Sequence, residues 1–216
     1  MTKSTKDRIT AIVLAGGESS RMGQDKALLT INNQPLLTQV CGVAKEVASL
    51  VYVVTPWIEK YQSILPSGCQ LVGERLVPGT KSNTPIIGFA RGLKLVQTEW
   101  VLLLACDLPR LSTSQVKQWS LALTTVLPTE IAYLPRNSKG WEVLCGFYRR
   151  DCLTSVETYI KNGGASFQSW LANHSVKELE LSDRSCLFNC NTPADWAAIR
   201  ECGGAGETGG QNLSDL

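Results

Sequence analysis

Short apolar runs alternate along this chain with longer segments whose apolar residues recur at helical spacing. This alternation predicts a sheet that is covered by helices on both faces. The expected strands are 9–14, 50–55, 70–72, 100–105, 131–134 and 143–148, with weaker candidates at 176–181 and 186–188. The expected helices are 35–48, 56–64, 85–95, 114–125, 151–161 and 193–201.

Three of the expected helices begin with the same dipeptide. Thr55, Thr84 and Thr192 each precede a proline. A threonine hydroxyl can cap a helix, and the fixed φ of proline suits the first helical position. Asp195 adds a carboxylate where a capping box needs one, so Thr192–Asp195 is predicted to close such a box.

The order of these elements predicts an α/β fold with a three-layer, mostly parallel, Rossmann-like sheet. With 216 residues and 44% hydrophobic residues, the chain suits one large domain with a full core, which we place at residues 1–202. Residues 203–216 are rich in glycine and lack an apolar run, so we expect a disordered tail.

Charge and cysteine usage narrow the classes of protein that fit. A net charge of +2 argues against a strongly electrostatic nucleic-acid binder. No apolar stretch approaches the length of a membrane span, and no secretory h-region precedes Ile9. The eight cysteines form no CxxC pair, and Cys41, Cys106 and Cys145 lie in or beside apolar runs, as small hydrophobic residues do. We therefore expect a protein of the reducing cytoplasm without structural zinc.

The segment Leu14–Leu29, which reads LAGGESSRMGQDKALL, is the strongest functional signal. Its glycines stand where the first expected strand ends, and open α/β sheets bind ligands at that edge. Gly16 and Gly17 lack a Cβ, so an anion can approach their backbone N–H groups. Arg21 adds a planar guanidinium group and Lys26 adds an ammonium group on a flexible side chain. Together they are suited to bind a polyphosphate.

Two well-known phosphate loops do not match this segment. A P-loop has four residues between its glycines and a Lys followed by Ser or Thr, whereas five residues separate Gly17 from Gly23 and Ala27 follows Lys26. The dinucleotide pattern GxGxxG is also absent, because the glycines are adjacent. A nucleotide would have to be bound by a different loop.

Asp107 follows the apolar run WVLLLA and is expected at the carboxyl end of a central strand, near the glycine turn. A carboxylate there is well placed to hold Mg²⁺, although a turn or N-cap aspartate is the alternative. Asn189 and Asn191 precede the last helix and read by themselves as turn-forming residues. His174, the only histidine, lies in a polar stretch and is expected at the surface.

Three motifs in order resemble one family of enzymes: LAGGESSRMGQDKALL, VLLLACDLPRL and FNCNTPADW. They are similar to motifs of the nucleotidyltransferases, and the LAGG, RMG and DK elements most closely resemble the molybdenum cofactor guanylyltransferases, known as MobA. The resemblance is spread over most of residues 9–200. It implies transfer of GMP from Mg·GTP to the phosphate of molybdopterin, with or without molybdenum. The products would be molybdopterin guanine dinucleotide and pyrophosphate.

The resemblance also implies roles for individual residues. Arg21, Lys26 and Asp107 would be catalytic, and Asp107 with Asn191 would hold Mg²⁺, Asn191 being a better positional match than Asn189. Asp25 would orient Lys26 or meet the metal. The nucleotide contacts would be Leu14, Ala15, Gly16, Gly17, Lys26 and Asp107.

A second segment, Gly79–Gly92, is a candidate for contact with the base or ribose through the helix that begins at Pro85. It departs from the family pattern, because Thr84–Gly88 reads TPIIG where Gly-Pro-Leu-x-Gly is usual. Other cofactor-synthesis proteins and recipient molybdoenzymes are implied as partners.

Two alternatives remain open at this point. The first is a sister enzyme, either the cytidylyltransferase for the same cofactor or a sugar-phosphate nucleotidyltransferase, which more often reads LAAG at positions 14–17. The second is a nucleotide-binding accessory protein without turnover. Pyrophosphate release with GTP, CTP, ATP and UTP distinguishes the enzymes from one another and from the accessory protein.

Overall fold

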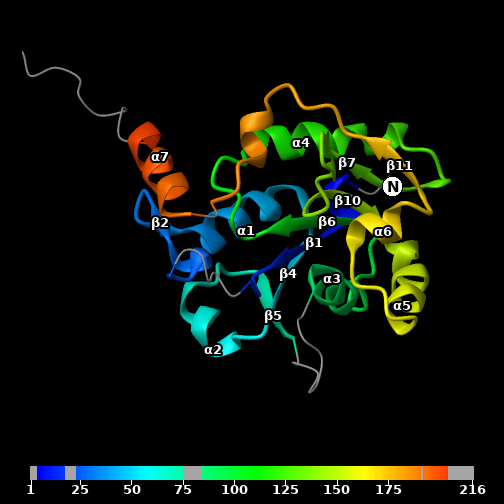
Figure 1. Cartoon of the computed structure of the whole chain (residues 1–216), viewed down its shortest axis with the longest axis horizontal. Coiled ribbons are helices and arrows are strands. Elements are labelled where there is room, and N and C mark those ends of the chain that lie inside the picture. The colour runs from blue at the N-terminus through cyan, green and yellow to red at the C-terminus, as the bar shows by residue number, and fades with distance from the viewer. Residues whose placement is uncertain (1–3, 18–22, 75–83, 191, 204–216) are drawn as a thin grey trace, which may run out of the picture.

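The computed structural model describes residues 4–17, 23–74, 84–190 and 192–203. Its main sheet has seven strands in the order β11-β7-β10-β6-β1-β4-β5 (Figure 1). In chain order these strands are β1 (Ile9–Leu14), β4 (Leu50–Thr55), β5 (Cys69–Gly73), β6 (Trp100–Ala105), β7 (Glu130–Leu134), β10 (Cys145–Arg149) and β11 (Ser175–Glu178). Two small hairpins stand apart from it, β2 (Thr30–Ile31) with β3 (Gln34–Pro35) and β8 (Arg136–Asn137) with β9 (Gly140–Trp141).

The sheet is mostly parallel, as the sequence predicts. β1 pairs in parallel with both β4 and β6, β4 with β5, and β7 with β11, while β10 is antiparallel to β6 and β7. Leu14 and Ala105 are register partners at the ends of β1 and β6. The residues that follow these two strands therefore emerge side by side at one edge of the sheet, where open α/β sheets bind ligands.

Helices cover both faces of the sheet and give three layers (Figure 1). The α-helices are α1 (Leu36–Val47), α2 (Ile58–Tyr61), α3 (Pro85–Leu93), α4 (Thr113–Leu121), α5 (Leu153–Lys161), α6 (Phe167–Leu171) and α7 (Pro193–Gly203). α1 and α4 pack on one face, whereas α3, α5 and α6 pack on the other. α7 lies at the end of the molecule near β2 (Figure 1), where Ile199 packs with Leu29 and Leu36.

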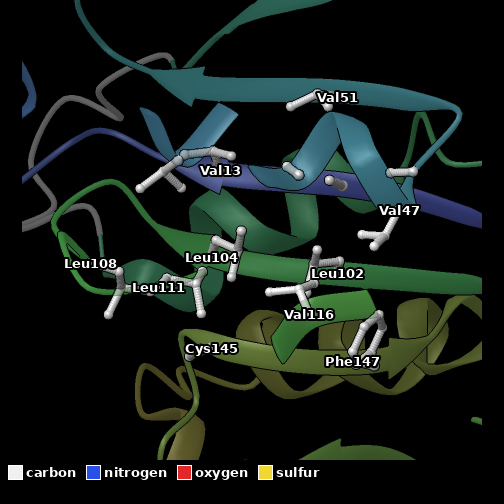
Figure 2. Close-up of a cluster of buried hydrophobic side chains, with 14 of the residues drawn as sticks. Val13, Val47, Val51, Leu102, Leu104, Leu108, Leu111, Val116, Cys145 and Phe147 are labelled. Carbon is white, nitrogen blue, oxygen red and sulfur yellow. The ribbon is translucent and has the colours of Figure 1, made fainter. Parts of the chain in front are cut away.

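The core between the sheet and the α1–α4 layer is built mainly from aliphatic side chains, with aromatic residues such as Phe147 among them (Figure 2). Val13, Leu102 and Leu104 point from the two central strands toward Val47 of α1 and Val116 of α4. All of these side chains are at most 3% exposed. Because β1 and β6 are covered on both faces, they read in sequence as continuous apolar runs rather than alternating ones.

The cysteines that the structure describes are free thiols, and most of them are buried. Cys41 and Cys145 lie in the α1–α4 core, as expected for small hydrophobic residues. Burial raises the pKa of the Cys145 thiol. Among the described residues, no helix combines the length and apolar character needed to span a bilayer.

Several local expectations were wrong. Residues 186–188, expected as a strand, lie largely in a 3-10 helix, η6 (Arg184–Leu187). α6 was not expected, because its five residues are too short for a periodic signal.

The Thr192–Asp195 capping box is confirmed, with Asp195 N at 3.1 Å from Thr192 Oγ1 and Thr192 N at 2.8 Å from Asp195 Oδ2.

The other two threonines do not cap helices with their hydroxyls. α2 begins at Ile58 rather than at Pro56, and Thr55 Oγ1 instead accepts from Trp57 N at 3.1 Å. Thr84 is the N-cap residue of α3, but its hydroxyl makes no capping hydrogen bond. The expected tail begins at Gly203, which ends α7, and residues 204–216 lie outside the described part of the chain.

Gly146 in β10 is closely packed against β7 and allows the packing of the sheet to be tested. A Cβ at Gly146 would lie 2.7 Å from the backbone oxygen of Tyr133 and 2.7 Å from Leu134 Cδ2. Gly146→Ala is therefore expected to lower the free energy of unfolding by about 1–3 kcal/mol. Gly42 is exposed on α1, and a Cβ there would meet nothing within 4 Å. Gly42→Ala should therefore raise the free energy of unfolding by roughly 0.5–1 kcal/mol. Urea unfolding of both variants checks the opposite signs, and equal effects would contradict this packing.

Candidate functional site

A cavity of about 260 Å³ opens at the carboxyl ends of the parallel strands. The turn after β1 forms one wall, from Leu14 to Gly17, and Asp107 after β6 forms another. Lys26 reaches it from a 3-10 turn, η2 (Lys26–Leu28), and Glu74 reaches it from the end of β5. The cavity therefore lies where the sequence predicts a ligand site, and it gathers residues from widely separated segments of the chain.

The glycine turn brings backbone into close contact with this cavity. A Cβ at Gly16 would lie 3.2 Å from Glu74 Oε2 and 3.2 Å from Pro56 Cδ, tighter than ordinary contact. A Cβ at Gly17 would meet nothing within 4 Å, so this glycine faces open space. Gly23 has a positive φ of 64°, which side chains other than glycine rarely adopt. Residues 18–22, including the predicted cation Arg21, lie outside the described residues.

Lys26 and Asp107 meet across the cavity. Lys26 Nζ lies 3.4 Å from Asp107 Oδ2, and their side chains are 17% and 18% exposed. The two residues are 81 positions apart, and the parallel pairing of β1 with β6 is what brings them together. The partly buried Lys26 ammonium can neutralise and orient a polyanion that binds beside it.

Asp25 is held in place by three donors. Tyr61 donates its hydroxyl to Asp25 Oδ2 at 2.8 Å, Lys60 Nζ lies 2.5 Å from the same oxygen, and Ala27 N donates to Oδ1 at 3.0 Å. The last of these bonds caps the turn that carries Lys26. Of the two roles expected for Asp25, this geometry favours orientation of the lysine turn over contact with a metal.

The Tyr61 hydroxyl is suited to that role. Tyr61 is only 1% exposed, and burial together with the Asp25 carboxylate raises its pKa well above the usual value. It therefore stays protonated and remains a donor to Asp25. Nothing in the sequence singles out Tyr61, because its direction depends on how α2 packs beside the cavity.

The cavity is lined by a further carboxylate, Glu74, that the sequence analysis did not single out. Glu74 is 9% exposed, and burial raises the pKa of its carboxyl group, against a smaller opposing effect of Arg91. Among the described residues no hydrogen-bond partner of this carboxylate is found. α3 approaches it closely, since a Cβ at Gly88 would lie 3.3 Å from Glu74 Oε1. Glu74 follows an expected strand, so the same edge rule that singled out Asp107 applies to it.

Thr84 lines the same cavity. Its Oγ1 is buried, without a hydrogen-bond partner in the described part of the chain, and the residue lines the cavity together with Pro85 and Gly88. An orphaned buried hydroxyl is costly unless a ligand or water satisfies it. Glu74 thus offers two carboxylate oxygens, and Thr84 a hydroxyl, to a ligand bound in this cavity.

A second cavity of about 270 Å³ adjoins the first. The two cavities share Ala105, Asp107 and Leu144, so Asp107 lies on the wall between them. Trp141 and Asn189 line the second cavity from two separate segments of the chain. Two ligands placed in the two cavities would therefore meet beside Asp107.

The C-terminal segment is tied to this wall. Cys190 N donates to the Asp107 backbone oxygen at 3.3 Å, which holds Asn189 in the second cavity. Asn191, the predicted partner of Asp107 in metal binding, lies outside the described residues.

His174 takes no part in either cavity lining. It is partly buried between α5 and α6, with Nε2 at 2.8 Å from Ser155 Oγ and Nδ1 at 2.9 Å from the Trp170 carbonyl oxygen. The expected surface position is therefore wrong in detail, because two helices enclose the ring.

Comparison with known proteins places this geometry in a family. The family model described as "MobA-like NTP transferase domain" matches residues 11–179. The "Probable molybdenum cofactor guanylyltransferase" of Nostoc sp. is 52% identical over 194 residues, covering 90% of this chain and 91% of the relative. A protein of the same name from Synechococcus elongatus is 41% identical over 191 residues, covering 88% and 97% of the two chains.

Solved structures agree at the level of the fold. The "Molybdopterin-guanine dinucleotide biosynthesis protein A" of Archaeoglobus fulgidus superposes with a TM-score of 0.72 at 19% identity, covering 89% of this chain and 97% of that one. A 4-diphosphocytidyl-2C-methyl-D-erythritol synthase of Anaerococcus prevotii gives a TM-score of 0.68 at 13% identity, with coverage of 93% and 99%. With its family match over most of its length and relatives at this identity, the chain belongs to the MobA-like nucleotidyltransferases.

Proposed function

We propose that this enzyme transfers GMP from GTP to the terminal phosphate of molybdopterin, with or without bound molybdenum. The products would be molybdopterin guanine dinucleotide and pyrophosphate. The observation that carries the proposal is the Lys26–Asp107 pair, 3.4 Å apart, in which Lys26 lines the first cavity and Asp107 lines both. A nucleotide in the first cavity and an acceptor in the second would place their phosphates beside this pair. The names of the close relatives point to the same reaction.

The chemistry needs an oxygen nucleophile and a leaving group but no protein nucleophile. A phosphate oxygen of the acceptor attacks the α-phosphorus of GTP, the new P–O–P bond forms, and the bond to the β-phosphate oxygen breaks. Lys26 neutralises charge that builds on the triphosphate and on departing pyrophosphate. Backbone groups from Leu14 to Gly17 fix the nucleotide in the orientation that in-line attack requires. We assign Arg21, which lies outside the described residues, to the same triphosphate on the strength of the sequence pattern.

Nucleotidyltransferases of this family generally use a divalent metal, and we propose Mg²⁺ held by Asp107 and Asn191. The Asp107 carboxylate supplies a hard oxygen ligand, which Mg²⁺ prefers, and the substrate phosphates would supply others. Asp25 is a poorer candidate, since three donors already occupy its oxygens. When bound, the ion would neutralise phosphate charge and order the triphosphate.

Glu74 and Thr84 support the choice of guanine. The Watson–Crick edge of guanine presents an N–H and an amino group side by side, and one carboxylate can accept from both. Glu74 offers such a carboxylate in the lining of the first cavity. The orphaned Thr84 hydroxyl is available for a further polar contact there. A cytosine or uracil ring lacks this pair of adjacent donors.

Pyrophosphate release tests the proposal. The purified protein is incubated with molybdopterin, Mg²⁺ and either GTP, CTP, ATP or UTP, and any dinucleotide is identified by mass. Turnover with GTP that depends on molybdopterin supports the proposal. Preference for CTP would indicate the sister cytidylyltransferase, turnover with a sugar phosphate would indicate that class, and GTP binding without turnover would indicate an accessory protein.

Tyr61→Phe gives a narrower test of how Lys26 is positioned. The variant removes only the hydroxyl that donates to Asp25, so the lysine turn loses one support while both cavities keep their shape. A lost hydrogen bond to a charged group, about 1.5 kcal/mol, corresponds to roughly a tenfold lower kcat. The KM for GTP should change little. Steady-state kinetics check this, and a raised KM with unchanged kcat would contradict it.

We further propose that residues 1–202 act as one domain and that the enzyme works in the cytoplasm. The cytoplasmic assignment is supported by the free thiols of the described residues. Partners would include other proteins of cofactor synthesis and the recipient molybdoenzymes. Co-purification with the tagged protein from Nostoc cells, which contain a 52% identical relative, would test these contacts.

A further inference from the structure

The second cavity carries a carboxylate of its own that has no role in the chemistry described so far. Glu142 lines this cavity together with Trp141 and Asp107. Trp141 ends β9 of the β8–β9 hairpin, and Glu142 begins the segment that leads from it into β10. Neither was singled out by the sequence, because the segment has no periodic pattern and no recognisable motif.

The backbone around Trp141 is fixed by a single glutamine of α6. Gln168 Nε2 donates to the Trp141 carbonyl oxygen at 2.6 Å, and Trp141 N donates to Gln168 Oε1 at 3.2 Å. Gly140 makes room for this contact, since a Cβ there would lie 2.8 Å from Gln168 Oε1. The Arg136 guanidinium lies 5.1 Å from the Trp141 ring centroid. Trp141 is therefore held both at its backbone, by Gln168, and at its ring, by Arg136.

Only one of the two carboxylate oxygens of Glu142 has a hydrogen-bond partner among the described residues. Its backbone N donates to the Pro135 carbonyl oxygen at 2.9 Å, and the Asn137 side-chain amide donates to Oε1. Within the described residues, Oε2 has no hydrogen-bond partner, and no ion pair to Glu142 is found. The carboxylate is partly buried, and a polar group in that position is costly unless a partner satisfies it.

The chemistry of the acceptor supplies such a partner. A pterin has a 2-amino-4-oxopyrimidine ring, whose edge presents an N–H beside an amino group, the same donor pair as guanine. Glu74 faces the first cavity and Glu142 faces the second, so each cavity offers one carboxylate to this edge. Asp107, on the shared wall, lies where the phosphates of the two substrates would meet.

We propose that Glu142 reads the 2-amino-4-oxopyrimidine edge of the acceptor pterin, with Trp141 as the wall of the pterin site. The inference rests on the proposed function only in taking the acceptor to be a pterin. Glu142 binds the ring and leaves the phosphate of the acceptor free to reach the wall at Asp107. It is a specificity residue for the acceptor, as Glu74 is for the nucleotide.

Calorimetric titration with 6-hydroxymethylpterin tests the proposal without GTP, metal or turnover. The pterin should bind the unmodified protein at least tenfold more tightly than 6-hydroxymethyllumazine (lumazine below), in which an oxo group replaces the 2-amino group. Glu142→Gln should weaken pterin binding by about 10–100-fold, the range for a lost charged hydrogen-bond acceptor. The same variant should bind pterin and lumazine equally and should keep the affinity for GTP.

Controls separate a local effect from a loss of fold. Glu178→Gln removes a charge at an exposed position of β11 outside both cavities and should bind pterin as the unmodified protein does. Urea unfolding of Glu142→Gln and Glu142→Asp identifies a variant that retains the fold. In such a variant, unchanged pterin affinity would overturn the proposal, as would equal binding of pterin and lumazine by the unmodified protein. Failure of the proposed function is distinct, since it would appear as pterin binding without pyrophosphate release.

Discussion

Replacing Lys26 by Ala is expected to lower kcat for GMP transfer by about a hundredfold or more. Lys26 is the described cation that stands beside Asp107, and the loss of one preorganised electrostatic donor has an effect of this size. The charge that Lys26 offsets grows as pyrophosphate leaves, so kcat should fall more than the affinity for GTP. Single-turnover measurements at saturating GTP isolate the chemical step.

A matched control removes the same charge elsewhere. Lys161 is exposed at the end of α5 and lines neither cavity, so Lys161→Ala should retain the kcat of the unmodified enzyme. Near-normal turnover of Lys26→Ala would exclude this lysine from the mechanism. An equal loss in both variants would show that net charge, rather than position, is responsible.

Glu74→Gln is expected to remove the preference for guanine. The unmodified enzyme should favour GTP over ITP by about 10–100-fold in kcat/KM, because ITP lacks the 2-amino group that Glu74 would accept from. In Glu74→Gln, the KM for GTP should rise by a similar factor while the KM for ITP changes little. Steady-state kinetics with both nucleotides measure the ratio, and Glu178→Gln serves as the control. An unchanged ratio would show that Glu74 does not contact the base.

The same carboxylate predicts a pH dependence. Burial raises the pKa of Glu74 above its ordinary value of 4.5, so its charged form is disfavoured in the folded protein without nucleotide. This group costs stability above the raised pKa, and the cost disappears as the pH falls below the unfolded value. Binding of guanine requires the ionised form, so the KM for GTP should rise as the pH falls through the raised pKa. Glu74→Gln should lack that rise.

The strands and most helices were predictable from the sequence, because burial on both faces leaves continuous apolar runs such as Ile9–Leu14 and Trp100–Ala105. The position of Asp107 at the ligand-binding edge followed from the same pattern. Short elements were not predictable: α6 has five residues, and η6 follows a run that looked like a strand. In such pieces local preference is weak, and packing against neighbouring layers decides the conformation.

The sequence by itself determined that a glycine turn, a lysine and an aspartate would meet at the carboxyl edge of a mostly parallel sheet. That follows from strand order along the chain and from the rule that parallel strands end at one edge. Only the tertiary structure decided which other polar groups join them. Tyr61, Glu74 and Glu142 come from segments distant in sequence, and their directions depend on how α2, β5 and the β8–β9 hairpin pack. Side-chain direction at a cavity is set by these long-range contacts, which no local pattern encodes.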